Sequence, residues 1–205
     1  MEAPTDLRLT YFNMPGRGEF IRLLFAYGNV PFEDSRITFQ EWGAKKATLD
    51  LPFGQMPILE THGKTYAQSL AIARYAAKLS GLYPADPLVA LEADSLIDAI
   101  LETWDVYNDI VYGHDDKDTK QQKLDNVGTT TFPRLLANLE KRVKEPFFTG
   151  DKPTHADIYL FDFHQHALLE YPTLAKELAT NYPKIAAIVE RVHNSNELAT
   201  YFKKA

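Results

Sequence analysis

Hydrophobic and polar positions alternate in two stretches of the first forty residues and recur at helical spacing between them. Leu7–Phe12 alternates and is rich in strand-forming residues, and the turn cluster Asn13–Gly18 follows it. Apolar side chains then recur three and four residues apart over Glu19–Gly28, which predicts a helix ending at its glycine. Pro31–Phe39 alternates weakly and predicts a second strand. The segment after it, up to Gly54, is expected to be irregular or briefly helical.

The next pattern predicts a hairpin followed by a helix. A strand that starts at Met56 leads to a turn at His62–Gly63 and a short second strand. A helix over Ser69–Leu79 follows, with Gly81 as its C-terminal stop. The predicted order β-α-β-α-β-β-α indicates a small mixed sheet covered by helices. Two prolines within Tyr83–Pro87 mark a linker.

Beyond that linker the apolar positions recur only at threes and fours, which predicts an all-helical second half. We therefore expect domains at 1–83 and 88–205, joined by a linker at 84–87. The charge-dense segment Gly113–Lys123 is expected to be a solvated helix end or loop rather than a metal site. The clearest helical stretches are Leu88–Tyr107, Phe132–Leu139, Ala156–Tyr171 and Pro183–Leu198.

Composition narrows the class of protein. With 205 residues, 45% of them hydrophobic and 24% charged, the chain can bury a sizeable core. A net charge of −6 argues against nucleic-acid binding, which needs a basic face. The chain has no apolar run of about eighteen residues, and its short acidic start is unlike a signal peptide, so we expect a cytoplasmic protein without a membrane span. Because there is no cysteine, any sulfur chemistry must use a ligand's sulfur.

Four stretches carry a resemblance to a known family: LTYFNMPGRGEFIRLLFAY, FGQMPILE, QSLAIARY and PTHADIYLFD. In this order and at this spacing they resemble the cytosolic glutathione transferases, nearest the Sigma class, over essentially the whole chain. The resemblance implies an α/β plus all-α fold, with an N-terminal thioredoxin-like βαβ-α-ββα domain and a C-terminal all-helical domain. It also implies glutathione as co-substrate, no metal, a hydrophobic small-molecule electrophile and a homodimer.

The resemblance makes Tyr11 the catalytic residue, because the family's tyrosine occupies this strand end. A lone tyrosine in a strand is more often a core or interface residue than a catalytic one. Only the position of Tyr11 at this strand end favours the catalytic interpretation. Its hydroxyl would donate a hydrogen bond to the glutathione sulfur and favour the thiolate. Arg17 would add positive field near the same sulfur, or it forms a surface ion pair.

Two short polar and proline-containing segments are expected to bind the peptide backbone and one carboxylate. Pro57 is cis in the family, which would let the backbone of Met56 pair with an extended peptide; the alternative is a simple edge-strand proline. Gln55 is the neighbouring polar candidate. Gln68 and Ser69 open a helix, where unpaired N–H groups favour an anion such as the γ-glutamyl carboxylate; the alternative is that Ser69 is only an N-cap and Gln68 only a turn residue.

The remaining glutathione contacts implied by the resemblance come from two further places. Trp42 and Lys46 would contact the cysteinyl portion and the glycine carboxylate, with Lys45 as the alternative to Lys46. Glu102 would reach the amino group of glutathione bound to the neighbouring subunit, with Asp98, one turn earlier, as the alternative. Phe53 and Arg74 are candidate dimer contacts. The electrophile pocket would draw on residues that individually pass for core: Met14, Phe39, Leu101, Asp105, Tyr159 and Phe163.

Two further motifs have structural interpretations. Thr154 and Asp157 have the spacing of a capping box before an apolar helix and are assigned to folding. His164 and His166 are two residues apart and face different sides of a helix, and with His155 they make no convincing metal set.

The sequence thus predicts an enzyme that ionises glutathione with Tyr11 and adds the thiolate to a hydrophobic electrophile. One alternative is a glutathione-dependent prostaglandin D isomerase, and another is a non-enzymatic protein of the ligandin or crystallin kind. The sequence does not select the electrophile.

Overall fold

The computed structural model describes residues 4–203 and divides them into two compact units. The first unit holds the described residues up to Tyr83 together with those from Ser195 onward, and the second holds Pro84–Asn194. The first unit contains strands β1 (Arg8–Phe12), β2 (Glu33–Ile37), β3 (Ile58–Thr61) and β4 (Lys64–Ala67), and helices α1 (Gly16–Tyr27), α2 (Phe39–Lys45), α3 (Ser69–Leu79) and α10 (Asn196–Phe202).

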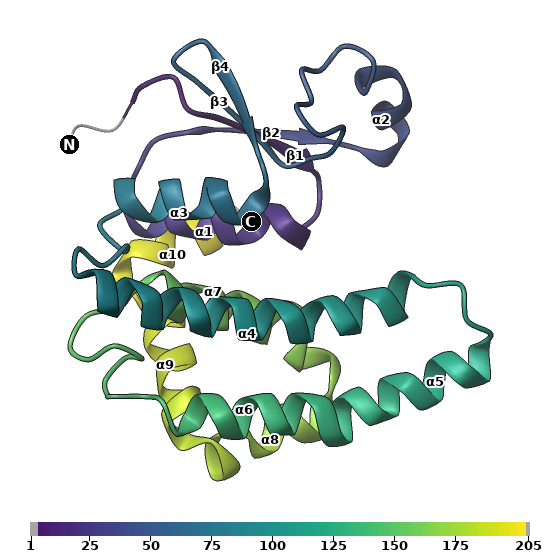
Figure 1. Cartoon of the computed structure of the whole chain (residues 1–205), viewed down its shortest axis with the longest axis vertical. Helices are drawn as coiled ribbons and strands as arrows, with labels where there is room; N and C mark the ends of the chain where they lie inside the picture. The colour runs from purple at the N-terminus through teal and green to yellow at the C-terminus, as the bar shows by residue number, and fades with distance from the viewer. Residues whose placement is uncertain (1–3, 204–205) are drawn as a thin grey trace. The chain divides into compact units, whose positions relative to one another are not determined.

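The four strands form one mixed sheet in the order β2-β1-β3-β4. β1 and β2 are parallel, whereas β3 is antiparallel to both of its neighbours. The β3–β4 turn has positive φ at both His62 and Gly63, which a two-residue hairpin of this twist requires, so the predicted turn is confirmed. α1 and α3 lie side by side along one face of the sheet, and α2 lies away from them (Figure 1).

The regular elements among the described residues of the second unit are helices, and an isolated β-bridge joins Phe147 and Gly150. The core of this unit includes Trp104, Phe132 and Phe163, all buried. The thioredoxin-like first unit and the helical second unit confirm the predicted fold class. The elements are α4 (Pro87–Tyr112), α5 (Lys117–Asn126), the π-helical turn η1 (Val127–Thr131), α6 (Phe132–Glu140), α7 (His155–His166), the 3₁₀ turn η2 (Leu168–Glu170), α8 (Pro172–Asn181) and α9 (Pro183–His193).

The helix α10 belongs to the first unit, although the sequence prediction assigned all residues after 88 to the helical domain. It packs on α1 through the buried Leu198, and the Tyr201 hydroxyl donates to Glu19. The last segment of the chain thus completes the unit that the first segment began. The domain boundaries at 83 and 88 stay a prediction.

Several element boundaries differ from the sequence prediction. The predicted helical stretches Ala156–Tyr171 and Pro183–Leu198 are each interrupted, after His166 and after His193. Further differences lie in the first unit. The strand predicted to reach Phe39 ends at Ile37, because Thr38 and Glu41 form a capping box that starts α2. Backbone and side-chain hydrogen bonds from Thr38 lower the pKa of the Glu41 carboxyl to about 2. The helix predicted from Glu19 begins earlier, at Gly16, directly after Pro15.

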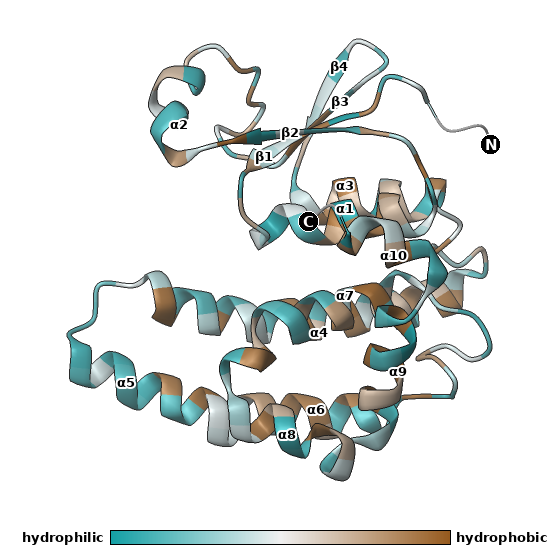
Figure 2. Ribbon diagram, turned by 180° about the vertical axis from the view of Figure 1, so that it is seen from behind, coloured by the Kyte–Doolittle hydropathy of each residue, from teal (hydrophilic) through white to brown (hydrophobic). Residues whose placement is uncertain are grey.

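The charge-dense segment after Gly113 contributes an exposed helix, α5, which Asp116 caps by accepting from the N–H groups of Asp118 and Thr119. α5 is hydrophilic along most of its length (Figure 2). Among the described residues no helix combines the length and the apolar character that crossing a bilayer requires.

Candidate functional site

The sheet register brings several of the predicted site residues to one end of the sheet. Ile58 of β3 pairs with Thr10 on one side and with Ala67 on the other. Because β3 runs antiparallel to both neighbours, the next residues beyond this row are Tyr11, Pro57 and Gln68. β2 runs parallel to β1 and ends at the same side, where α2 begins. Tyr11, the loop that contains Pro57, the start of α3 and the start of α2 therefore lie at the same end of the sheet.

Tyr11 lies near the end of β1 with its ring buried and its hydroxyl at the first turn of α1. The backbone N–H of Arg17 donates to the Tyr11 hydroxyl oxygen over 3.1 Å. The start of a helix carries partial positive charge, and a hydroxyl that accepts one hydrogen bond can also donate one. The hydroxyl is therefore polarised towards stabilising an anion. The Arg17 side chain itself is exposed.

Two glycines allow α1 to approach the Tyr11 ring this closely. A Cβ atom on Gly18 would lie 2.5 Å from Cδ1 of Tyr11, and one on Gly16 would lie 2.8 Å from its hydroxyl oxygen. Gly16 also has a φ of +43°, a conformation that costs glycine little. The sequence marked these glycines only as turn residues. Their packing against the tyrosine could not be predicted from the pattern.

α2 places Trp42 and Lys46 beside Phe12, the neighbour of Tyr11. The Trp42 ring packs edge-on against Phe12 with centroids 5.4 Å apart, and the Lys46 ammonium lies 5.6 Å from the Trp42 ring centroid. Lys45 instead forms an ion pair with Glu41 over 3.1 Å. The arrangement favours Lys46 over Lys45 as the ligand contact, which stays a prediction.

The loop before β3 contains Gln55, Met56 and Pro57, and the Met56–Pro57 peptide bond is cis. Pro57 is buried, Met56 is half-buried and Gln55 is exposed. The resemblance implied this bond geometry. The contact of these residues with a peptide stays a prediction.

Gln68 has an unusual backbone conformation at the start of α3. Its φ is +75° and its ψ is 108°, and its side chain makes no capping hydrogen bond. For a residue that is not glycine, such a conformation costs on the order of 1–3 kcal/mol and is commonly found at functional sites. Gln68, not Ser69, holds the N-cap position of α3, so the alternative interpretation of Ser69 as the N-cap is wrong. Gln68 is exposed and Ser69 half-buried at the opening of the helix, where N–H groups favour an anion.

Glu102 and Asp98 lie one turn apart on α4 in the second unit, and both are exposed. The proposed reach of Glu102 to a neighbouring subunit stays a prediction.

The residues expected in the electrophile pocket fall into two groups. Phe163 is fully buried in the second unit, with its ring centroid 5.5 Å from Trp104 and 5.0 Å from Phe132, which supports its alternative interpretation as core. Tyr159 is also buried there, and Leu101, Asp105 and Met14 are half-buried.

Phe39 is 67% exposed and stacks on Phe12 with centroids 4.7 Å apart. The stacked pair was not anticipated from the sequence, because Phe39 was expected in a strand.

The capping box of α7 is present as predicted. The Thr154 hydroxyl accepts from the N–H of Ala156, and Asp157 accepts from the N–H groups of Thr154 and Phe148. Burial raises the pKa of the Asp157 carboxyl, and these hydrogen bonds oppose the rise.

Two of the three histidines of α7 have carboxylate partners in the second unit. His155 lies 3.0 Å from Asp94, and His166 lies 2.8 Å from Asp162. Burial lowers the pKa of His164. Within residues 4–203, no three His, Asp or Glu side chains are grouped so as to hold a metal ion.

Two family models match the chain. The glutathione S-transferase N-terminal domain matches residues 7–78, and a glutathione S-transferase C-terminal domain matches residues 102–205. Together these ranges include the predicted glutathione contacts, whereas Asp98 and Leu101 lie in the unmatched stretch between them.

Characterised relatives match at nearly full length. The chain is 35% identical to a hematopoietic prostaglandin D synthase of Gallus gallus, over 97% of this chain and 96% of the relative. It is equally 35% identical to a glutathione S-transferase of Anopheles gambiae, with the same coverage of both chains. It is also 35% identical to S-crystallin SL11 of Nototodarus sloanii, over 96% of this chain and 95% of the relative.

Solved structures agree with this assignment. A structure described as rat hPGDS complexed with a quinoline superposes with a TM-score of 0.85 at 31% identity, covering 97% of this chain and 96% of that one. The prostaglandin synthase D of Nilaparvata lugens superposes with a TM-score of 0.82 at 30% identity, covering 97% of this chain and 98% of that one. With Tyr11 at the helix start and Gln68 at the same sheet end, these matches show that the chain belongs to the glutathione S-transferase family, with Sigma-class-like relatives.

Proposed function

We propose that this protein is a glutathione transferase that binds reduced glutathione at the Tyr11 end of the sheet and adds the glutathione thiolate to a hydrophobic electrophile. The observation that carries the proposal is the hydrogen bond from the Arg17 N–H to the Tyr11 hydroxyl, at the first turn of α1. A tyrosine held there can donate a hydrogen bond to a ligand sulfur and so favour its thiolate form. A free thiol has a pKa of about 8.5. If binding lowers this pKa by about two units, most of the thiol is ionised at neutral pH, and the shift corresponds to ~2.7 kcal/mol of thiolate stabilisation.

The remainder of the peptide has suitable partners around Tyr11. Gln68 and Ser69 at the start of α3 would hold the γ-glutamyl carboxylate, and the backbone of Met56 before Pro57 would pair with the cysteinyl portion. Gln55, Trp42 and Lys46 would hold the other end of the peptide, and Arg17 would add positive field near the sulfur. Glu102 of the partner subunit would meet the amino group in a homodimer.

The stacked Phe12–Phe39 pair suggests the kind of electrophile. Phe39 presents most of its ring to solvent, two residues beyond β2 and beside the Tyr11 edge of the sheet. An exposed aromatic face stacks well on a planar, electron-poor ring. We infer that aromatic electrophiles are accepted, in keeping with a cytoplasmic role in detoxification. Phe39→Ala should raise the Michaelis constant for such an electrophile and leave that for glutathione nearly unchanged.

A second candidate function is the glutathione-dependent isomerisation of prostaglandin H2 to D2. It is favoured by the relatives named hematopoietic prostaglandin D synthase, which match this chain over nearly its full length. In that reaction glutathione returns unchanged. The likeness to S-crystallins also suggests a non-enzymatic role as a lens protein or a simple carrier. Such a role would not require the strained backbone of Gln68 or the Tyr11 hydroxyl, and these two features therefore favour an enzyme.

The test is turnover of 1-chloro-2,4-dinitrobenzene with glutathione, run beside prostaglandin H2 with glutathione. Conjugate formation by the wild type, lost in Tyr11→Phe, supports the transferase. Product D2 without conjugation supports the isomerase instead. Binding of a hydrophobic dye with neither activity would contradict both and favour the carrier.

A further inference from the structure

Arg22 of α1 is a charged residue with no solvent exposure, and all of its contacts fix the surroundings of Tyr11. Its Nε lies 3.0 Å from Oδ1 of Asp34, and its Nη1 lies 3.1 Å from Oε2 of Glu19. A buried guanidinium is costly unless carboxylates and carbonyls surround it, so these contacts hold Arg22 in one position. Its Cζ lies 5.8 Å from the ring centroid of Tyr11.

The remaining donors of Arg22 hold the loop that follows Tyr11. Nη2 donates to the carbonyl oxygen of Phe12 over 3.2 Å, and Nη1 donates to that of Met14 over 2.9 Å. This loop leads into α1, whose Arg17 N–H returns to the Tyr11 hydroxyl. The guanidinium thus fixes the loop that positions the hydroxyl.

The far end of this network comes from the last helix of the chain. The Tyr201 hydroxyl of α10 donates to Oε1 of Glu19 over 2.6 Å, leaving Oε2 of the same carboxylate for Arg22. Burial, and then the charge of Glu19, raise the pKa of Tyr201 well above its ordinary value. Tyr201 therefore stays a neutral donor over the working pH range, and it holds Glu19 in the orientation that Arg22 needs.

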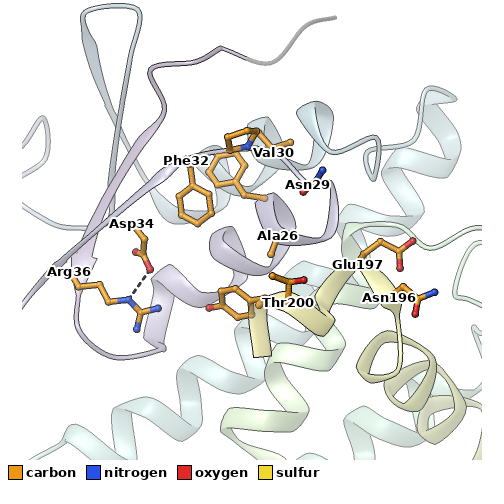
Figure 3. A pocket seen from close by; sticks show the side chains of 12 residues that line it. Ala26, Asn29, Val30, Phe32, Asp34, Arg36, Asn196, Glu197 and Thr200 are labelled. Carbon is orange, nitrogen blue, oxygen red and sulfur yellow. Dashed lines mark hydrogen bonds and ion pairs between the residues drawn. The ribbon is translucent and has the colours of Figure 1, made fainter. Parts of the chain in front are cut away.

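A surface hollow of about 740 Å³ lies beside this network, between α10 and the segment from α1 to β2 (Figure 3). None of the predicted glutathione contacts lines it, whereas Tyr201, Asp34 and Arg36 do. Asp34 and Arg36 pair at 2.7 Å with side chains 24% and 35% exposed, so water weakens that pair. The Glu19–Arg22 pair is almost fully buried, so water weakens it less than the Asp34–Arg36 pair.

We propose that Tyr201 is a positioning residue for the reaction: through Glu19 and Arg22, the C-terminal helix sets the place of the Tyr11 hydroxyl. The inference rests on the proposed function, because it assumes that Tyr11 activates the glutathione thiol. It adds that a residue far from the sulfur, at the opposite end of the chain, tunes that activation.

The test compares Tyr201→Phe with Tyr182→Phe in the full-length chain. Both variants remove one partly buried tyrosine hydroxyl that donates to a single oxygen, since Tyr182 donates to the carbonyl of Pro133 over 3.3 Å in the second unit. The thiol pKa of bound glutathione is followed by the ultraviolet absorbance of its thiolate. In Tyr201→Phe we expect that pKa to rise and kcat at neutral pH to fall by roughly three- to tenfold, with a smaller change in KM for glutathione.

Amide hydrogen exchange gives a readout independent of turnover. Exchange over residues 13–17 should speed up in Tyr201→Phe and stay as in the wild type in Tyr182→Phe. In a double-mutant cycle, Glu19→Gln combined with Tyr201→Phe should change kcat by less than the product of the two single changes, because both act through Arg22.

The outcomes separate this inference from the proposed function. An inactive wild type, or a Tyr11→Phe variant with an unchanged thiol pKa, overturns the proposed function. If Tyr11→Phe behaves as expected but Tyr201→Phe only lowers the melting temperature, with thiol pKa and loop exchange unchanged, Tyr201 has a merely structural role and the inference is wrong.

Discussion

At the residue scale, the proposed chemistry depends on a single hydroxyl, that of Tyr11. Tyr11→Phe removes it and keeps the ring that packs on Gly18, so folding should be close to unchanged. The pKa of the bound thiol should then rise towards about 8.5, and the rate near pH 6.5 should fall roughly ten- to a hundredfold, or about 1.4 to 2.7 kcal/mol. A pH–rate profile shifted to higher pH is the expected signature. Tyr112→Phe, on an exposed side chain, is the control, and a mutant that kept its rate at pH 6.5 would exclude Tyr11 as the activating residue.

The position of the Tyr11 ring also depends on Gly18, which packs against it. Gly18→Ala places a methyl group within 2.5 Å of the Tyr11 ring, which must move. We expect a loss of about 1–3 kcal/mol in the free energy of unfolding, together with a drop in kcat. Gly43→Ala in α2 is the control, because no heavy atom lies within 4 Å of its added methyl group. That change should instead stabilise by about 0.5–1 kcal/mol. Equal effects of the two substitutions on kcat would contradict the close packing at Tyr11.

At the scale of elements, the capping box of α7 should be the most sensitive helix start. Both carboxylate oxygens of Asp157 accept a backbone N–H, and asparagine has only one acceptor oxygen. Asp157→Asn should therefore lower the free energy of unfolding by about 1–3 kcal/mol. In α5 a single oxygen of Asp116 accepts both N–H groups, so Asp116→Asn should change stability by less than about 0.5 kcal/mol. Chemical denaturation measures both, and equal losses would be evidence against this reasoning.

The same scale shows what the sequence could and could not predict. Periodicity located the sheet, the His62–Gly63 turn and the helical second half, because these depend on local spacing. Alternation extended the second strand too far, although Thr38 and Glu41 carried a readable capping signal. The place of α10 was missed because its Tyr201–Glu19 contact joins residues 182 positions apart, which no local pattern encodes.

For the whole molecule we predict a homodimer. α4 exposes Leu88 and Leu91, three residues apart, and Phe53 is exposed in the first unit. Sedimentation at low micromolar concentration should give twice the 23.3 kDa mass of the chain. A monomer with full activity would contradict this prediction.

The dimer prediction also allows a test of Glu102 across subunits. Mixing Tyr11→Phe subunits with Glu102→Ala subunits should form dimers with one complete site, because the intact Tyr11 of one chain meets the intact Glu102 of the other. We expect the mixture to recover high glutathione affinity with substantial turnover, which neither parent has. The same experiment with Asp98→Ala distinguishes the two acidic residues, and no recovery with either variant would place both outside the site.

The pairing of Ile58 with Thr10 and Ala67 has a consequence for divergence. It places the predicted site residues Tyr11, Pro57 and Gln68 at one end of the sheet and leaves the β3–β4 turn at the other. There the carboxylate of Asp6 accepts from the N–H of His62 and the hydroxyl of Thr61, which closes that end with its own bonds. Insertions and new surface features can therefore accumulate at the hairpin tip during evolution while the chemistry at the opposite end is retained.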